Sequence, residues 1–231
     1  MSTQPDSATN LRLSLLSIQG TLASATLDAA RALHNQTAGA RESVAAARAL
    51  GDMSHMVYVP TTQQGDAAGE FLILDIWKSM EGLNSFFANP QVQEQAGQIF
   101  SSRDPVVWAP ADGFISYHFP APGGQNERYI GVVRGPVQGH MAAQESHNAL
   151  VTTHIATARL RGNLSHEAYF RLAAPNSLEA LEFFAVDVWS SASGMQEHYR
   201  DPAFLQSYGG LFTAAPAAST WQRPTGEWVE W

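Results

Sequence analysis

Two side chains that carry protons, histidine and aspartate, recur at matched places in the chain. His55 lies in a largely apolar stretch and is matched by His166, while Asp75 is matched by Asp187 in a second apolar stretch. A neutral histidine takes up and releases protons near pH 7, and a carboxylate held in an apolar strand orients it or exchanges a proton with it. The pattern indicates proton transfer. The alternative for each residue is a structural role, with hydrogen bonds to the backbone.

His198 has no counterpart of its own kind, because Phe86 occupies the matching position. A neutral imidazole there is a candidate catalytic base, and an exposed histidine on a polar helix is the alternative. Trp77 and Trp189 each follow an aspartate by two residues, so on a strand they share its face. We expect the catalytic residues to be His198, His166 and Asp187, and the substrate-binding residues to be His55, Asp75, Trp77 and Trp189.

The remaining motifs argue against metal and cofactor chemistry. His140, His147 and His154 are spaced by seven residues, or about 10.5 Å along a helix, whereas helical ligands of one metal ion stand three or four residues apart. The sequence has no glycine-rich phosphate loop and no nucleophile elbow. It has no cysteine, which excludes thiolate ligands and disulfides. We therefore expect no metal and no cofactor.

A duplication sets the positions of these residues. Residues 51–58 recur as 162–169, and residues 71–100 align with 183–212 without a gap. Between the two copies lies a stretch rich in proline and glycine, which is typical of a linker. We expect a flexible N-terminus at 1–10, a first domain at 11–119, a linker at 120–127 and a second domain at 128–231.

Each half has the same order of expected elements: strand, helix, strand, strand, helix, strand. The expected strands are 11–18, 53–59, 71–77 and 114–119 in the first half, and 129–133, 164–172, 183–189 and 227–231 in the second. An alanine-rich helix is expected over 24–50, ended by Gly51. Ser79 and Ser191 are expected helix N-caps, and Pro90 and Pro202 are expected to begin further helical segments. This order is the ferredoxin-like arrangement. Two such repeats packed face to face predict an α+β fold, an intramolecular dimeric α/β barrel.

The run Asp-x-Trp-x-Ser-x-x-Gly, followed by a helix and a proline, resembles the antibiotic biosynthesis monooxygenase family of dimeric α/β barrels. The fuller match lies in the second half, at Asp187, Trp189, His198, Pro202 and Phe204. The resemblance implies an apolar cavity inside the sheet barrel, in which many members oxidise quinols or polyketide phenols without a cofactor. Other members degrade haem, isomerise lactones or have no known reaction. The haem-degrading members carry a tryptophan at the position of Phe86 or His198, which this chain lacks.

These observations favour a cofactor-independent oxygenase acting on an electron-rich aromatic such as a quinol, an anthrone or a polyketide-type phenol. In this hypothesis His198 or His166 removes a proton from the substrate, and Asp187 orients a histidine or a water. The sequence leaves open whether the chain is an enzyme. The alternative is a non-catalytic protein that binds a small apolar ligand or acts as a scaffold, and haem binding or degradation is a third hypothesis.

Composition restricts the partners. The chain has 45% hydrophobic and 15% charged residues and a net charge of -8, which disfavours nucleic acid and anionic membrane surfaces. No apolar run is long enough to span a membrane, and the first seven residues lack the features of a secretory signal. We expect a cytoplasmic protein, either a monomeric pseudo-dimer or a homodimer, whose partner is a small apolar or aromatic molecule.

Overall fold

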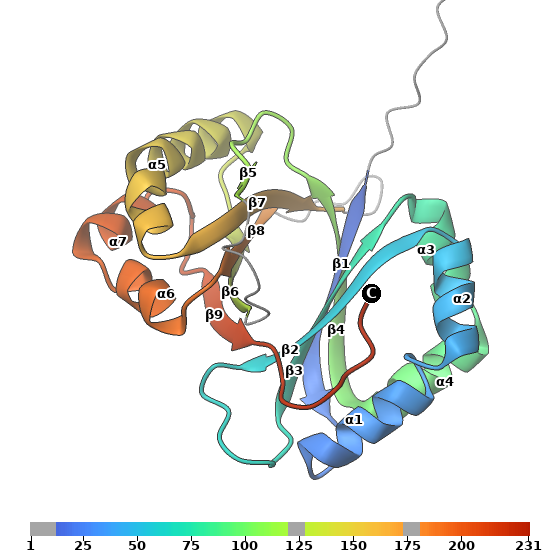
Figure 1. Ribbon diagram of the computed structural model, residues 1–231. Coiled ribbons are helices and arrows are strands. Elements are labelled where there is room, and N and C mark those ends of the chain that lie inside the picture. The colour runs from blue at the N-terminus through green and yellow to red at the C-terminus, as the bar shows by residue number, and fades with distance from the viewer. Residues whose placement is uncertain (1–12, 120–127, 173–180) are drawn as a thin grey trace, which may run out of the picture.

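The computed structural model describes residues 13–119, 128–172 and 181–231. Within them, nine strands form one antiparallel sheet in the order β4-β1-β3-β2-β9-β6-β8-β7-β5. β4 also pairs with β7, so the eight strands from β4 to β7 in this order close into a barrel (Figure 1). The expected flexible N-terminus at 1–10 and the expected linker at 120–127 lie outside the described residues.

The two halves contribute equivalent elements. The first half contains β1 (Ser14–Leu22), α1 (Leu27–Gln36), α2 (Arg41–Ala49), β2 (Asp52–Pro60), β3 (Glu70–Trp77), α3 (Met80–Phe87), α4 (Pro90–Ile99) and β4 (Phe100–Pro110). The short strand β5 (Tyr117–His118) follows. The second half contains β6 (Tyr129–Pro136), α5 (His140–Leu160), β7 (Asn163–Arg171), β8 (Glu182–Trp189), α6 (Ala192–Tyr199), α7 (Pro202–Tyr208) and β9 (Ala217–Gln222). The strand orders β4-β1-β3-β2 and β9-β6-β8-β7 confirm the predicted ferredoxin-like repeat.

Local signals in the sequence set many of these boundaries. The hydroxyl oxygens of Ser79 and Ser191 accept from Gly82 N–H and Gly194 N–H, as expected for N-caps. Pro90 and Pro202 begin α4 and α7. Gly51, just after α2, has φ 102°, a left-handed conformation that glycine adopts without strain.

The prediction of the last strand in each half is wrong. The fourth strands are β4 and β9, whereas residues 114–119 form only the two-residue strand β5 and residues 227–231 form none. After the buried Phe100, β4 continues through residues 101–105, which are mostly polar and mostly exposed, so its apolar alternation covers only its last part. β9 is mostly small and polar, Ala-Ala-Ser-Thr-Trp-Gln. Neither strand has the apolar pattern that identifies a buried strand from sequence.

The prediction of one helix over 24–50 is also wrong, because α1 and α2 are separated at residues 37–40. A Cβ placed on Gly39 would lie 2.7 Å from Cβ of Val229, so the break is packed tightly against the C-terminal residues. The equivalent α5 of the second half is unbroken.

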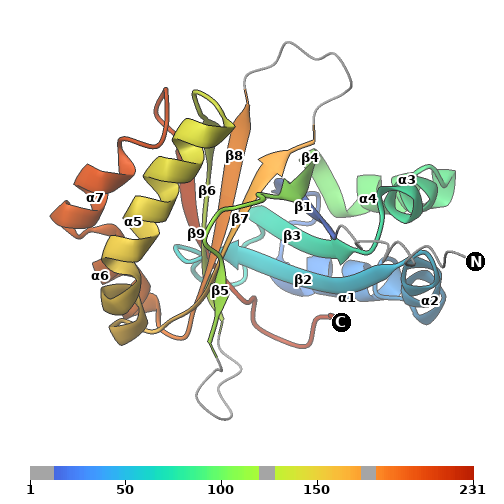
Figure 2. The same cartoon turned by 90° about the horizontal axis from the view of Figure 1, so that it is seen from above.

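The interior of the barrel is filled with side chains from both halves. Among them are Leu72, Trp108, Ile130, Phe184 and Trp221, all fully buried or nearly so. The helices cover the outer faces, α1–α4 on the first half and α5–α7 on the second (Figure 2). The prediction of a cavity inside the barrel is therefore wrong, because large aromatic residues occupy that volume.

Each half sends the residues after its last strand over the other half. We call residues 111–119 and 223–231 the crossing segments. The backbone N–H groups of Ala111 and Phe119 donate to the second half, at Ala168 and Leu164. His55 and Trp231 exchange backbone hydrogen bonds of 2.8 and 3.2 Å, which holds the other segment on the first half (Figure 1). Within the described residues, no helix is long and apolar enough to cross a membrane.

Candidate active site

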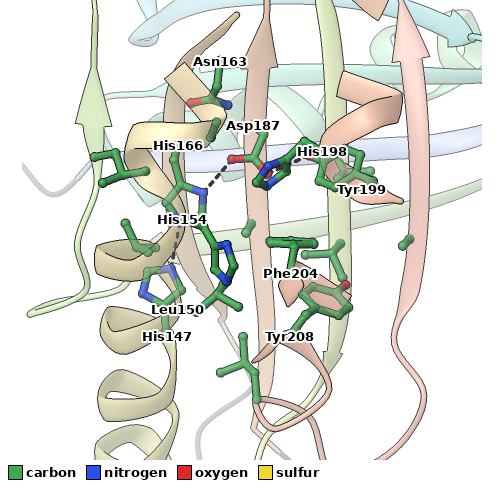
Figure 3. A pocket seen from close by; sticks show the side chains of 18 of the residues that line it. His147, Leu150, His154, Asn163, His166, Asp187, His198, Tyr199, Phe204 and Tyr208 are labelled. Atoms are coloured by element: carbon green, nitrogen blue, oxygen red, sulfur yellow. Dashed lines mark hydrogen bonds and ion pairs between the residues drawn. The ribbon is translucent and has the colours of Figure 1, made fainter. Parts of the chain in front are cut away.

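A cavity of about 270 Å³ lies between the sheet of the second half and its helices α5, α6 and α7 (Figure 3). Its wall is mostly apolar, with Leu150, Phe183, Ala185, Phe204 and Leu211 among the lining residues. Polar side chains also line it, and His166, Asp187, His198 and Tyr199 lie together toward one end. An apolar cavity with a few converging polar groups is the usual form of a small-molecule site.

Two neighbouring strands and one helix bring three polar residues into a chain. His166 on β7 lies directly opposite Asp187 on β8, and its Nδ1 is 2.7 Å from Asp187 Oδ1. Nε2 of His166 is 2.7 Å from Nε2 of His147, which α5 presents to the sheet. We call His147, His166 and Asp187 the second-half relay. The other carboxylate oxygen of Asp187 accepts a 2.7 Å hydrogen bond from the hydroxyl of Tyr199 on α6.

Burial and ion pairing set the protonation of this chain. Burial lowers the pKa of His147 to about 4, and the nearby His166 adds to the effect. Burial alone would raise the pKa of Asp187, but His166 and the hydrogen bonds from His166 and Tyr199 hold it below its usual value. Burial beside this carboxylate raises the pKa of Tyr199 well above its usual value. At neutral pH, His147 is therefore neutral, Asp187 is a carboxylate and Tyr199 is a hydrogen-bond donor.

His198 completes the polar end of the cavity from α6. Its side chain is buried against Phe204 and Trp189, with ring centroids 4.3 and 5.1 Å away, and burial lowers its pKa to about 4. Within the described structure, Nδ1 of His198 is buried without a hydrogen-bond partner, and so is Oδ1 of Asn163. Buried polar atoms are nearly always hydrogen-bonded, so both atoms are suited to bonding a ligand.

The first half repeats the relay without the large cavity. Nε2 of His34 is 3.0 Å from Nε2 of His55, whose Nδ1 is 2.7 Å from Asp75 Oδ1. The adjoining space is only about 60 Å³, and Phe86 and Phe87 line it at the positions of His198 and Tyr199. The relay is thus common to both halves, whereas the large cavity and its free histidine belong to the second.

A difference on the first strand of each half contributes to this asymmetry. Gly131 on β6 lies opposite Asp187, and a Cβ on it would be 2.0 Å from the hydroxyl of Tyr199. The residue opposite Asp75 in the first half is Leu16 on β1. The missing side chain at Gly131 therefore makes room for Tyr199 to reach Asp187.

The residues expected from the sequence fall into three groups. His166, Asp187, His198 and Trp189 all line the large cavity. His55 and Asp75 line the small one. Trp77 is fully buried and lies outside the residues that line either cavity, packed against Phe86 and Phe87. In the described part of the chain, no three His, Asp or Glu side chains are grouped to hold a metal ion.

Sequence reasoning missed His147 and His34 as members of the relays. The signal was present, because each is followed by asparagine, His34-Asn35 in one half and His147-Asn148 in the other. His140, His147 and His154 are spaced by seven residues on α5, and this spacing was weighed only as a possible metal site. The duplication was the informative pattern.

The strand order, the closed barrel and the outer layer of helices define a tandem dimeric α/β barrel. Solved structures share this fold over nearly the whole chain. An anthrone oxidase-like protein matches with a TM-score of 0.64 and 18% identity, over 94% of this chain and 93% of its own. Monooxygenase candidates from Fusobacterium nucleatum and Lactobacillus acidophilus match with TM-scores of 0.59 and 0.53 and identities of 10% and 11%. These cover 93% and 91% of this chain and 93% of each of their own.

No family model and no curated protein sequence matches the chain. At these identities the structural likeness shows the fold, and it confirms the predicted dimeric α/β barrel of two ferredoxin-like repeats.

Proposed function

We propose that the second-half cavity is the active site of a cofactor-independent oxygenase acting on a hydroxylated or enolisable aromatic of the anthrone or quinol class. The observation that carries the proposal is the difference between the halves. Both keep a relay, but the second alone combines it with a large cavity and with His198, whose Nδ1 has no partner among the described residues. The likeness to an anthrone oxidase-like protein supports this substrate class.

The first step is removal of a proton from the substrate by His198. Its low pKa keeps the imidazole neutral at pH 7, so it has a lone pair with which to accept the proton. An anion that forms beside the new imidazolium is stabilised by the opposite charge, and the apolar wall keeps out water that would weaken this attraction. The aromatic lining, with Phe204 and Trp189 beside His198, supports a planar ring in this place.

The oxidant in this proposal is dioxygen. The substrate anion gives one electron to O2, and the resulting radical pair joins to form a carbon–oxygen bond in a peroxide anion. For an anthrone-type methylene, a proton returned by the His198 imidazolium and loss of the remaining C–H proton release water and leave a carbonyl. The balance is CH2 + O2 → C=O + H2O, in which the substrate loses four electrons and O2 gains four.

Oxygen uptake by chelator-treated protein, measured with an anthrone, a quinol and a simple phenol, tests the proposal. We expect uptake above autoxidation with one O2 consumed per substrate, and a fall in kcat/KM of about 10²-fold or more in His198→Phe. The matched control is Phe86→Leu at the same position of the first half, which should stay within about twofold of the wild type. Uptake equal to autoxidation with all three compounds would overturn the proposal, as would an unimpaired His198→Phe variant.

A further inference from the structure

The side-chain amide of Asn148 has only one orientation that satisfies its neighbours. The backbone N–H of Ile115 donates to Asn148 Oδ1 at 2.8 Å, and Asn148 Nδ2 donates to the carbonyl oxygen of Gly113 at 2.9 Å. A backbone N–H only donates and a carbonyl only accepts, so the oxygen and nitrogen of the amide are distinguished. Gly113 and Ile115 both belong to the crossing segment that comes from the first half.

This orientation fixes the tautomer of His147. Oδ1 of Asn148 is 3.1 Å from Nδ1 of His147 and carries no hydrogen, so Nδ1 must donate. Burial lowers the pKa of His147 to about 4, and a neutral ring with its hydrogen on Nδ1 has a lone pair on Nε2. That lone pair is 2.7 Å from Nε2 of His166. The hydrogen between the two rings therefore belongs to His166.

The second nitrogen of His166 also carries a hydrogen. It is 2.7 Å from Oδ1 of Asp187, whose other oxygen accepts from Tyr199. Burial opposes ionisation of Asp187, but His166 and Tyr199 outweigh it and hold its pKa below the usual value, so this group is a carboxylate that only accepts. His166 must then donate from Nδ1 as well as from Nε2.

We propose that Asn148 is a positioning residue that fixes the tautomer of His147 and thereby keeps His166 doubly protonated, as a cation in the wall of the cavity. The groups that contact this cation are Asp187 from β8, His147 from α5 and the ring of Tyr117 from the crossing segment, while Tyr199 and His198 from α6 act on Asp187 behind it. Its use, which rests on the proposed function, is to stabilise the substrate anion that forms when His198 takes the proton. Both nitrogens of His166 are occupied, so His166 acts through its charge and His198 is left as the base.

The first half reproduces this hydrogen-bond pattern with different residues. Asn35 Oδ1 accepts from Val229 N–H at 2.9 Å, and Asn35 Nδ2 donates to the carbonyl of Glu227 at 2.8 Å. Nδ1 of His34 is 3.1 Å from the same Oδ1, which again leaves its Nε2 to accept from His55. Here too the backbone atoms that hold the asparagine side chain lie on the crossing segment that comes from the other half.

Electrostatics in the first half agree with this assignment. Burial and the neighbouring His55 lower the pKa of His34 to about 4. Burial alone would lower the pKa of His55, but Asp75 and the more distant Asp52 and Glu230 raise it above its usual value. The first-half relay therefore also pairs a neutral histidine with a histidine cation, although no large cavity adjoins it.

The test is nuclear magnetic resonance of the full chain labelled with 15N at histidine, at pH 7.5 and without substrate. We expect His166 and His55 to show two protonated ring nitrogens, and His147 and His34 to show the Nδ1–H tautomer. In Asn148→Ala the His147 ring loses its acceptor and adopts the Nε2–H form, so His166 should become neutral. Asn148→Asp keeps a carboxylate oxygen for His147 and should keep the cation. Asn35→Ala is the matched control, which should change His55 and leave His166 unchanged.

A neutral His166 in the wild type would overturn the inference, and so would a doubly protonated His166 in a folded Asn148→Ala variant. If Asn148→Ala does not fold, the wild-type and Asn148→Asp spectra still decide the matter. On an active substrate, Asn148→Ala should lower kcat by about 10²-fold with little change in KM, and Asn148→Asp should restore most of it. The spectra need no turnover, so failure of the proposed oxygenase reaction would be recognised separately from failure of the proton assignment.

Discussion

Three buried histidines make the stability of this protein sensitive to acid. His34, His147 and His198 have pKa values lowered to about 4, chiefly by burial. In the unfolded chain a histidine has a pKa of about 6.5. Between these values the unfolded chain binds more protons than the folded one, so stability is lost as the pH falls from about 6.5 to 4.

The size of the effect follows from the change in pKa. A lowering from 6.5 to about 4 corresponds to about 3.4 kcal/mol per histidine once the pH is below both values. At pH 5 the loss is about 2 kcal/mol each, relative to pH 7.5. His198→Phe removes one of the three titrating groups and introduces the residue that the first half has as Phe86. We therefore expect the variant to lose about 2 kcal/mol less than the wild type between pH 7.5 and pH 5.

Other groups shift in both proteins and cancel in the comparison. His55, with its raised pKa, contributes stability that is full below pH 6.5 and is lost as the pH rises through its folded pKa. Asp52 has a pKa raised to about 7 by burial and by Asp75, so its folded form gains stability as the pH falls. Both lie in the half that His198→Phe leaves unchanged.

Urea unfolding at pH 7.5 and pH 5.0 measures the four free energies of unfolding that this comparison needs. The slope of free energy against urea should agree between the wild type and the variant, which shows that the same surface is exposed on unfolding. A variant that loses as much stability as the wild type, or more, would show that His198 is not a buried neutral histidine.

Three further variants test particular contacts. Tyr199→Phe leaves one oxygen of Asp187 without its donor and should lower the free energy of unfolding by about 1–3 kcal/mol, whereas an unchanged urea midpoint would mean that the contact is absent in solution. Gly131→Ala places a Cβ on the Tyr199 hydroxyl and should be destabilising in the same direction. In a double-mutant cycle it should cost less in the Tyr199→Phe background, and additive effects would contradict this. Trp231→Ala removes a half-buried ring stacked 4.5 Å from His55 and should cost about 3 kcal/mol of stability, while ligand binding in the second half stays unchanged. Calorimetric unfolding with a binding titration separates these outcomes.

The parts of the fold that the sequence predicted were those with strong periodic signals. The apolar alternation of the inner strands, the serine caps and the glycine after α2 each have a local physical cause, and each was placed within a few residues. β4 and β9 were missed because polar or small residues occupy much of each strand, so their pairing depends on barrel closure and not on their own pattern. The break between α1 and α2 was missed because its packing against Val229 joins residues far apart in the chain.

The sequence predicted individual residues of the candidate site, most of them on strands and His198 on a helix, but it did not predict the hydrogen-bond network that joins them. The duplication singled out His166 by its match to His55 and Asp187 by its match to Asp75, and only the register of β7 on β8 shows that the two are neighbours. His147 lies on α5. The face of this helix that packs against the sheet could not be identified from the sequence, because that requires the position of the sheet. The role of Asn148 depends on a segment that crosses from the other half, which no local pattern within the second half encodes.

If the cavity of the second half is the ligand site, the chain should bind one ligand, and the stoichiometry of binding measures this. Calorimetric titration with an anthraquinone, the oxidised form of the proposed ring system, should give one site per chain. Leu150→Trp, which fills the cavity from α5, should abolish that binding in a protein that still unfolds cooperatively, and Phe86→Leu should leave it intact. Two equivalent sites per chain, or binding that survives Leu150→Trp, would show that the cavity of the second half is not the ligand site.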